Sequence, residues 1–440
     1  LNIIYSYYFN LYINVDSYIS SLVVSLILTT ILFIVKKNQS KLSIYNKIIV
    51  VLSGYLIIPI IIALPYYFSI YNLSLVDSYF EAVSGFTSTG FTIFNNLRQI
   101  DESLLLWRST SQWVGGLYFL FSIIILIDIF DTNLRKSLTN FISFNSSEIF
   151  KQASKVFIIY LILTIIIFIL LKFIDLRDFD AFNFALSIIS SGGFKPTNQI
   201  NYILDQDYKI IIFSLTLLIS FFSIFLIYNL LFLKNRYLNF FTEDLYLLFY
   251  LVSIIFIFFI FFSNNNFPEL LLSITTSVSN IGIYFDGYNS NLFFFYLILV
   301  IIGGSFFSTS SGIRLFKIIT LIRFSINELL SHTKPKQVMV NKYFFNESSI
   351  DYNIINRYFL TIVIFVFSLI VISSLISISG LEFAVSIKLG ILTIMNTVNS
   401  SLYGLQNFDF QNINHYTKFI LIIFMIIGRV ELLTVIILFK

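Results

Sequence analysis

The chain has 440 residues, of which 58% are hydrophobic and only 11% are charged. A soluble domain carries roughly a quarter of its residues as charged side chains, so this composition excludes a soluble protein and indicates that lipid covers much of the surface. Cysteine is absent, which excludes a disulfide framework and thiolate chemistry. The net charge is only +4, and we expect lipid and protein partners rather than nucleic acid.

Nine apolar stretches are long enough to cross a membrane, which requires about 20 residues for about 30 Å of hydrocarbon. The predicted spans are 18–36, 46–70, 104–130, 155–174, 208–233, 243–262, 291–330 with an interruption, 357–379 and 416–439. The first stretch ends at Lys36-Lys37, whereas a signal peptide carries its positive charge before the apolar run. We therefore interpret 18–36 as a spanning helix.

Four shorter apolar runs lie between these spans, at 78–88, 179–190, 268–279 and 383–396. They are too short to cross the membrane, and each leads into a small or polar turn. The unit of span, short helix, turn and span thus recurs four times, with a period of roughly 100 residues that is typical of structural repeats. The predicted fold is an all-α integral membrane protein with four helix–pore-loop–helix repeats around a central pore.

The repeats divide the chain into six regions. These are an N-terminal membrane helix region, 1–45; repeat one, 46–131; repeat two, 132–236; repeat three with a broken inner helix, 237–330; a cytoplasmic linker, 331–356; and repeat four, 357–440.

The basic residues predict the orientation. Eighteen of the 27 Lys and Arg residues fall on one side under this topology, which the positive-inside rule assigns to the cytoplasm. They are Lys36, Lys37, Lys41, Lys47, Arg135, Lys136, Lys151, Lys155, Lys234, Arg236, Arg314, Lys317, Arg323, Lys334, Lys336, Lys342, Arg357 and Lys440. All four short helices then enter from the outside.

The four turns predict a path for cations. Non-helical backbone at membrane depth is tolerated only where it is buried in protein or lines water. Four such segments around one axis can offer carbonyl oxygens in place of the hydration shell of a cation, and short helices ending there add partial negative charge. The candidate ion-binding residues are Ser88, Thr89, Gly90, Ser190, Ser191, Gly192, Asn280, Ile281, Gly282, Thr397, Val398 and Asn399.

Several motifs together resemble one known family. The segment Glu81-Ala-Val-Ser-Gly-Phe-Thr-Ser-Thr-Gly90 resembles the first filter of the TrkH/KtrB/HKT superfamily of potassium transporters, and of its TrkH branch especially. Similar resemblances are carried by Trp113-Val-Gly-Gly116, Ser190-Ser-Gly-Gly-Phe194, Gly303-Gly-Ser-Phe-Phe-Ser-Thr-Ser-Ser-Gly-Ile-Arg314 and Gly428-Arg-Val-Glu431. The matches run in order from about residue 46 to the end of the chain.

The resemblance implies uptake of potassium, as the transported ion and without a bound cofactor, across a bacterial plasma membrane. It also implies a homodimer, regulation by a cytoplasmic nucleotide-binding ring on a partner chain, and filter glycines at Gly90, Gly192 and Gly282. The implied gate is the 303–312 loop, with Gly303, Gly304, Ser305, Ser308 and Gly312, and we add the hypothesis that Arg429 holds this gate closed. Family members carry two helices before repeat one, and this chain starts at Leu1 with one clear span, so we expect a truncated first helix.

The chain departs from the family pattern in the fourth turn, where Asn399 stands at the expected glycine. Asn tolerates left-handed backbone geometry, but its side chain would narrow the ring, so a sodium or weakly selective cation transporter is the alternative function. The sequence assigns no place to Lys195 or Lys388, and it does not indicate coupling to protons or sodium.

Plainer interpretations exist for each motif. The glycines could serve close helix packing, and 303–312 could be a simple break between helices. An arginine inside a membrane helix is costly, so Arg429 either holds the 303–312 loop through its carbonyls or makes a structural pair with Glu431 or with carbonyls of the short helices. We interpret His332, His415, Asp128 and Asp131 as solvated surface residues.

Two other function classes make different demands. A secondary transporter with inverted repeats needs segments of opposite orientation, whereas these four units enter from one side. A membrane enzyme needs clustered carboxylates, histidines or a phosphate-binding loop, which the sequence lacks, so we predict that the chain is not an enzyme.

Overall fold

The computed structural model describes residues 1–34, 43–126, 149–198, 200–228, 242–261, 266–285, 292–333, 352–405 and 408–430. Several sequence predictions fall outside these ranges: those for Lys36, Lys37, Lys41, Asp128, Asp131, Arg135, Lys136, Lys234 and Arg236, for most of the linker 331–356, and for Glu431 to Lys440.

Each repeat contains a long helix, a short helix that ends inside the protein, and a second helix. Repeat one comprises α3 (Ile44–Tyr67), α4 (Leu75–Phe86) and α5 (Glu102–Ile125); repeat two comprises α7 (Ile149–Lys172), α8 (Asp178–Ile189) and α10 (Asp207–Leu217) with α11 (Ile224–Tyr228). Repeat three comprises α12 (Thr242–Phe261), α13 (Phe267–Val278), α14 (Phe293–Ile301) and α15 (Leu315–Thr333); repeat four comprises α16 (Tyr352–Ile378), α17 (Phe383–Ile394) and α18 (His415–Val430).

The packing of these helices closes a ring of repeats. The first helix of each repeat packs on its own short helix, and the second helix packs on the short helix of the next repeat. These second contacts pair α5 with α8, α10 with α13, α14 with α17, and α18 with α4. Because the last pair joins repeat four to repeat one, the repeats surround a common axis. The predicted all-α fold with four repeats is confirmed.

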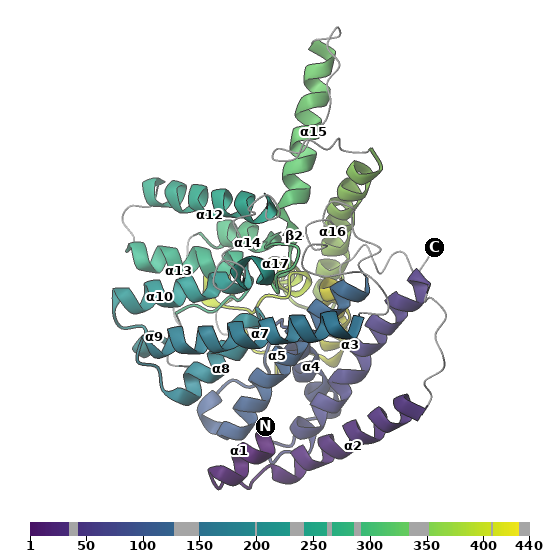
Figure 1. The fold of residues 1–440 in the computed structure, drawn as a ribbon, viewed down its shortest axis with the longest axis vertical. Helices are drawn as coiled ribbons and strands as arrows, with labels where there is room; N and C mark the ends of the chain where they lie inside the picture. Colours follow the sequence, from purple (N-terminus) through teal and green to yellow (C-terminus); the bar gives the residue numbers. More distant parts are fainter. Residues whose placement is uncertain are drawn as a thin grey trace.

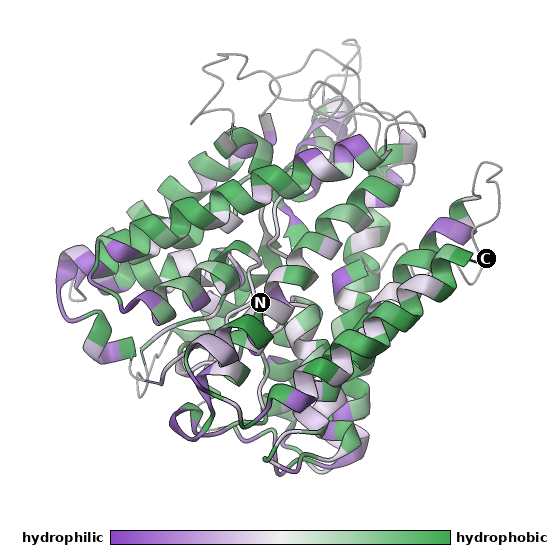
Figure 2. Ribbon diagram, turned by 60° about the horizontal axis from the view of Figure 1, so that its bottom comes forward, coloured by the Kyte–Doolittle hydropathy of each residue, from purple (hydrophilic) through white to green (hydrophobic). Residues whose placement is uncertain are grey.

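Two helices precede the repeats in the described part of the chain. The first, α1 (Asn2–Tyr8), lies against the start of α5, where the Asn2 side-chain amide donates a hydrogen bond to the Ser103 carbonyl at 2.6 Å. The second, α2 (Val15–Ile34), is one of five described helices that are long and apolar enough to span a membrane, together with α3, α7, α12 and α16. Figure 2 shows long helices that are hydrophobic along most of their length, with hydrophilic residues gathered near the ends, as expected for helices covered by lipid.

The predicted continuous span at 208–233 is wrong, because the helix breaks in its middle. Helix α10 ends at Leu217, a 3-10 turn follows at Leu218–Ser220, and α11 starts only at Ile224. The broken helix leaves backbone groups to be satisfied, and the 303–312 segment satisfies them. The Ser305 N–H donates to the Phe221 carbonyl at 3.0 Å, and the Ile224 N–H donates to the Phe307 carbonyl at 3.1 Å.

The predicted interruption in repeat three is the segment 303–312, here named the inner loop. Two short parallel strands, β1 (Ile302–Gly303) and β2 (Ile313–Arg314), join its ends. This close approach requires glycine, because a side chain on Gly303 would collide with the Ser311 carbonyl and Gly312 has φ +96°. Figure 1 shows α15 projecting away from the other helices after this loop.

Candidate functional site

The four turns after the short helices follow the same backbone path. Each short helix is followed by a residue in left-handed geometry, namely Ser88 (φ 58°), Ser191 (φ 56°), Asn280 (φ 59°) and Asn396 (φ 47°). The N–H of the next residue then donates to the carbonyl five residues back. These bonds are Thr89 to Ser84 (2.9 Å), Gly192 to Ser187 (2.8 Å), Ile281 to Thr276 (3.1 Å) and Thr397 to Leu392 (2.9 Å). The shared bond establishes which residues are equivalent.

The equivalence corrects the expected register in two loops. Two residues after each left-handed residue stand Gly90, Gly193, Gly282 and Val398, which we name the ring. The three glycines all have positive φ, of 80°, 75° and 73°. The glycine equivalent to Gly90 in the second loop is therefore Gly193 rather than Gly192, and the departure in the fourth loop is Val398 rather than Asn399.

The ring residues meet at one point. A Cβ atom added to Gly90 or Gly193 would lie 3.0 Å from the Val398 Cβ, and one added to Gly282 would lie 2.7 Å from the Val398 Cγ1. A side chain this close to three loops must stand between them. The glycines also adjoin backbone oxygens: a side chain on Gly90 would collide with the Gly192 carbonyl, and one on Gly193 with the Ile281 carbonyl. The four loops therefore converge, with backbone oxygens close to their meeting point.

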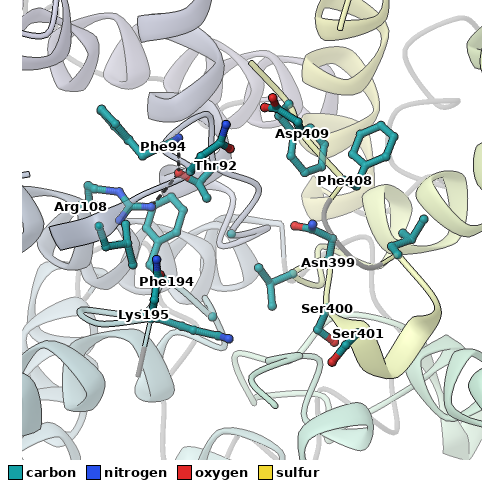
Figure 3. Close-up of a pocket in the computed structure, with 18 residues that line it drawn as sticks. Thr92, Phe94, Arg108, Phe194, Lys195, Asn399, Ser400, Ser401, Phe408 and Asp409 are labelled. Carbon is teal, nitrogen blue, oxygen red and sulfur yellow. Dashed lines mark hydrogen bonds between the residues drawn. The ribbon is translucent and has the colours of Figure 1, made fainter. Parts of the chain in front are cut away.

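A cavity of about 580 Å³ opens on one side of the ring (Figure 3). Its lining includes Gly90, Gly193 and Val398 together with Arg108, Phe194, Lys195, Asn399, Ser400 and Asp409. Lys195 reaches across it from the Phe194 side, and its ammonium group donates to the Tyr284 carbonyl at 3.3 Å. The Lys388 ammonium group instead donates to the Gly404 carbonyl at 3.1 Å, over the Phe293 ring. Of these two lysines, only Lys195 lines the cavity.

A buried ion pair braces the first loop. The Arg108 Nε lies 2.9 Å from the Glu81 Oε1, and their side chains are 2% and 0% exposed. The other Glu81 oxygen accepts the Ile93 N–H at 3.0 Å, and the Arg108 Nη2 donates to the Thr92 hydroxyl at 2.9 Å. The guanidinium group also stacks 4.2 Å from the centre of the Phe194 ring. The pair thus links the first loop to the second.

Gln112 on α5 braces the second loop. Its amide nitrogen donates to the Gly192 carbonyl at 2.7 Å, while its oxygen accepts from the Ser187 hydroxyl at 2.9 Å and the Phe194 N–H at 3.2 Å. Neither Arg108 nor Gln112 is among the site residues predicted from the sequence. Their signal was present, since a charged and an amide side chain stand inside a predicted membrane span.

Arg314 holds the inner loop through its carbonyls. Its Nη1 lies 2.7 Å from the Ser305 carbonyl oxygen, 3.1 Å from that of Gly304 and 3.3 Å from that of Ser310. Within the loop, the Ser308 hydroxyl donates to the Ser305 carbonyl at 2.7 Å. Arg429 was expected to bind these carbonyls, and Arg314 is not among the site residues predicted from the sequence.

Arg429 contacts the same loop in a different way. Its Nη1 donates to the Ser311 hydroxyl at 2.8 Å, and its guanidinium group lies 4.2 Å from the centre of the Phe119 ring. The expected bonds from Arg429 to loop carbonyls are therefore wrong, because Arg314 occupies them. The Arg429 Nη2 also lies 3.5 Å from the carbonyl oxygen of Ser190, the residue that directly follows the second short helix. This contact agrees with the alternative expectation of bonds to carbonyls of the short helices.

The inner loop touches the ring loops directly. The Thr309 hydroxyl donates to the Ile189 carbonyl at 2.7 Å and lies 3.2 Å from the Ser191 hydroxyl. Asn396 provides a second link, because its amide nitrogen donates to the Thr89 hydroxyl at 3.0 Å and to the Met425 carbonyl at 2.9 Å. The structure thus joins both sets of predicted site residues into one continuous site.

Comparisons with known proteins agree with this architecture. No protein-family model matches the chain. An uncharacterized cation transporter of Methanocaldococcus jannaschii is 24% identical over 92% of this chain and 85% of its own length. The Trk system potassium uptake protein TrkH of Halomonas elongata is 23% identical over 83% of this chain and 79% of its own length. TrkH of Salmonella typhimurium is 30% identical, over 30% of this chain and 29% of its own length.

A solved structure shares the whole fold. The crystal structure of the potassium transporter TrkH from Vibrio parahaemolyticus superposes with a TM-score of 0.80, at 20% identity, over 98% of this chain and 97% of the TrkH chain. The family resemblance of the motifs is thus matched by full-length relatives and by the fold. The chain therefore has the fold of TrkH and is similar over most of its length to a cation transporter and to a Trk system potassium uptake protein.

Proposed function

We propose that the chain transports potassium ions across the plasma membrane through the ring, and that it is a transporter rather than an enzyme. The observation that carries this proposal is the convergence of four equivalent loops, with backbone oxygens beside the three ring glycines. Such oxygens replace the hydration shell of a cation. The names of the relatives, a cation transporter and potassium uptake proteins, support the same cargo.

The short helices favour a cation at the ring. All four end two residues before the left-handed residue of their loop. The C-terminus of a helix carries partial negative charge, so four helix ends around one axis lower the energy of a dehydrated cation there. Inward movement of each positive charge then gains about 2.3 kcal/mol per 100 mV of membrane potential.

The inner loop is the proposed gate. It contacts the Ile189 carbonyl and the Ser191 hydroxyl directly behind the ring, so an ion leaving the ring meets this loop next. The gate residues are Gly303, Gly304, Ser305, Ser308, Gly312 and Arg429, to which we add Thr309 and Arg314. Opening requires the inner loop to break its hydrogen bonds with Arg314 and Arg429.

The proposed assembly follows the Trk system. We propose a homodimer in the membrane and a separate nucleotide-binding subunit in the cytoplasm that controls the gate. The projection of α15 directly after the inner loop supports this, because a partner that binds α15 could pull on the gate (Figure 1).

A sodium or weakly selective cation transporter is the second candidate. The observation that favours it is Val398, which supplies a hydrocarbon side chain where the other three loops have glycine.

An ion-substitution series on purified protein in lipid vesicles tests the proposal. We expect rubidium uptake, driven by an inside-negative potential, to exceed sodium uptake. Arg429→Ala is expected to change the flux and its regulation, whereas Arg177→Ala, at an exposed arginine, leaves both unchanged. Equal uptake of the two ions would support the second candidate, and absence of ion-dependent uptake from folded protein would contradict both.

A further inference from the structure

The fourth ring position differs from the other three in both chemistry and backbone. Val398 is only 7% exposed. A Cβ atom added to Gly90, Gly193 or Gly282 would lie within 3.0 Å of its side chain. Unlike the three glycines, Val398 has no positive φ. The isopropyl group therefore stands between the loops, on the path that the proposed function requires.

We propose that Val398 determines which ions pass the ring and how fast, by obstructing its axis with a hydrocarbon group. This inference rests on the proposed transport function. An ion at the ring must replace its lost water with oxygen ligands. Where methyl groups face the ion, desolvation is not compensated, and a hydrophobic constriction is formed. The obstruction lowers the rate of potassium passage and its preference over sodium.

A change of rotamer cannot clear the axis. The Val398 Cβ itself is 3.0 Å from the point where a Cβ added to Gly90 or to Gly193 would stand. The position of a Cβ is determined by the backbone and does not change with the rotamer. A β-branched residue is also a strong outlier at positive φ, so the fourth loop cannot simply adopt the glycine conformation. An ion passes only when the fourth loop itself shifts.

The bonds of the fourth loop connect this shift to the gate. Asn396 bonds to Thr89 in the first loop and to the Met425 carbonyl on α18, and its oxygen lies 3.5 Å from the Ser311 hydroxyl of the inner loop. Arg429 on α18 binds the same hydroxyl. A displacement of the inner loop therefore reaches the loop that carries Val398.

The test compares rubidium and sodium uptake into vesicles, and equilibrium rubidium binding, for the parent and four variants. Restoring one ligand position, comparable to a hydrogen bond with a charged group, is expected to raise rubidium flux about tenfold in Val398→Gly and to increase its preference over sodium. Val398→Ala keeps the Cβ and is expected to be intermediate. Val398→Thr keeps the branched shape but replaces one methyl group by a hydroxyl oxygen, so its rubidium flux is expected to lie between those of the parent and Val398→Gly.

Val156→Ala is the matched control, because Val156 is a buried valine on the long helix α7, which contributes no residue to the ring. It should leave the flux ratio of the parent unchanged. Thermal unfolding of each variant in detergent shows whether it is folded. If Val398→Gly does not fold, the comparison is made with Val398→Ala instead.

The outcomes separate the two levels of inference. If parent, Val398→Gly and Val398→Ala all transport rubidium at one rate and with one ion preference, the role of Val398 is overturned while the transport function stands. If folded parent and variants neither bind nor transport rubidium, the proposed function is overturned together with it.

Discussion

The ring and the inner loop lie next to each other but are held in different ways. The first two ring loops are braced from behind by side chains with several partners each, the Glu81–Arg108 pair and Gln112. The inner loop depends on Arg314, which places one nitrogen near three carbonyls, and on Arg429, which binds one hydroxyl. The difference suggests that the protein keeps the ring in place while allowing the inner loop to move.

The largest effect is expected from breaking the brace of the ring. Arg108→Met leaves the Glu81 carboxylate buried without its partner, and breaking such a pair costs about 3–5 kcal/mol. A large drop in the thermal unfolding midpoint of the purified protein is expected.

Glu81→Gln with Arg108→Met should recover part of that loss, because no charge is then left unpaired. Arg177→Met, at an arginine whose side chain is 59% exposed, should cost at most about 1 kcal/mol. An Arg108→Met protein as stable as the parent would show that the ring does not depend on this brace.

A smaller effect on stability, but a visible one on flux, is expected at the inner loop. Arg314→Gln removes charge-assisted bonds to three carbonyls, at a cost of about 2 kcal/mol. The loop should leave its closed position more often, so rubidium leak into vesicles should rise severalfold without loss of the fold. A fall in leak, or a loss of stability as large as that of Arg108→Met, would remove the distinction between the two regions.

The smallest effect is expected at the mouth of the cavity. Lys195→Gln removes a positive charge that faces incoming cations, so the rubidium concentration that gives half-maximal uptake should fall about twofold at low ionic strength. The difference from the parent should vanish at high salt, because salt screens the charge. Lys388→Gln is the control, because Lys388 does not line the cavity. An effect that persists at high salt would show that Lys195 acts through its bond to the Tyr284 carbonyl instead.

Much of the fold could be predicted from the sequence because apolar length is a direct signal. A stretch of about 20 apolar residues can cross the membrane and one of about 12 cannot. The length of each apolar stretch therefore separates spans from short helices, and their alternation reveals the four repeats. The break after Leu217 could not be predicted in this way, since 208–233 is mostly apolar and contains neither proline nor glycine. That break exists because the inner loop bonds to Phe221 and Ile224, which lie far from it in sequence.

The register of the ring residues could not be predicted from the sequence motifs. Ser190-Ser-Gly-Gly-Phe194 offers two adjacent glycines, and Asn396-Thr-Val-Asn-Ser400 offers none, so the letters alone cannot decide which residue is equivalent to Gly90. The hydrogen bond to the carbonyl five residues back decides it. Arg314 was missed for a related reason: in sequence it is one more cytoplasmic basic residue, and only the fold turns it towards the loop.

The packing of α18 on α4, which joins the last repeat to the first, has a consequence for how such a protein can evolve. In a channel assembled from four identical subunits, any substitution near the axis appears four times at once. Here one gene encodes all four quadrants, so a mutation alters a single quadrant and leaves the rest intact. A lone valine beside three glycines is a composition that four identical subunits could not produce, and it lets a single substitution change one quadrant of the ring at a time.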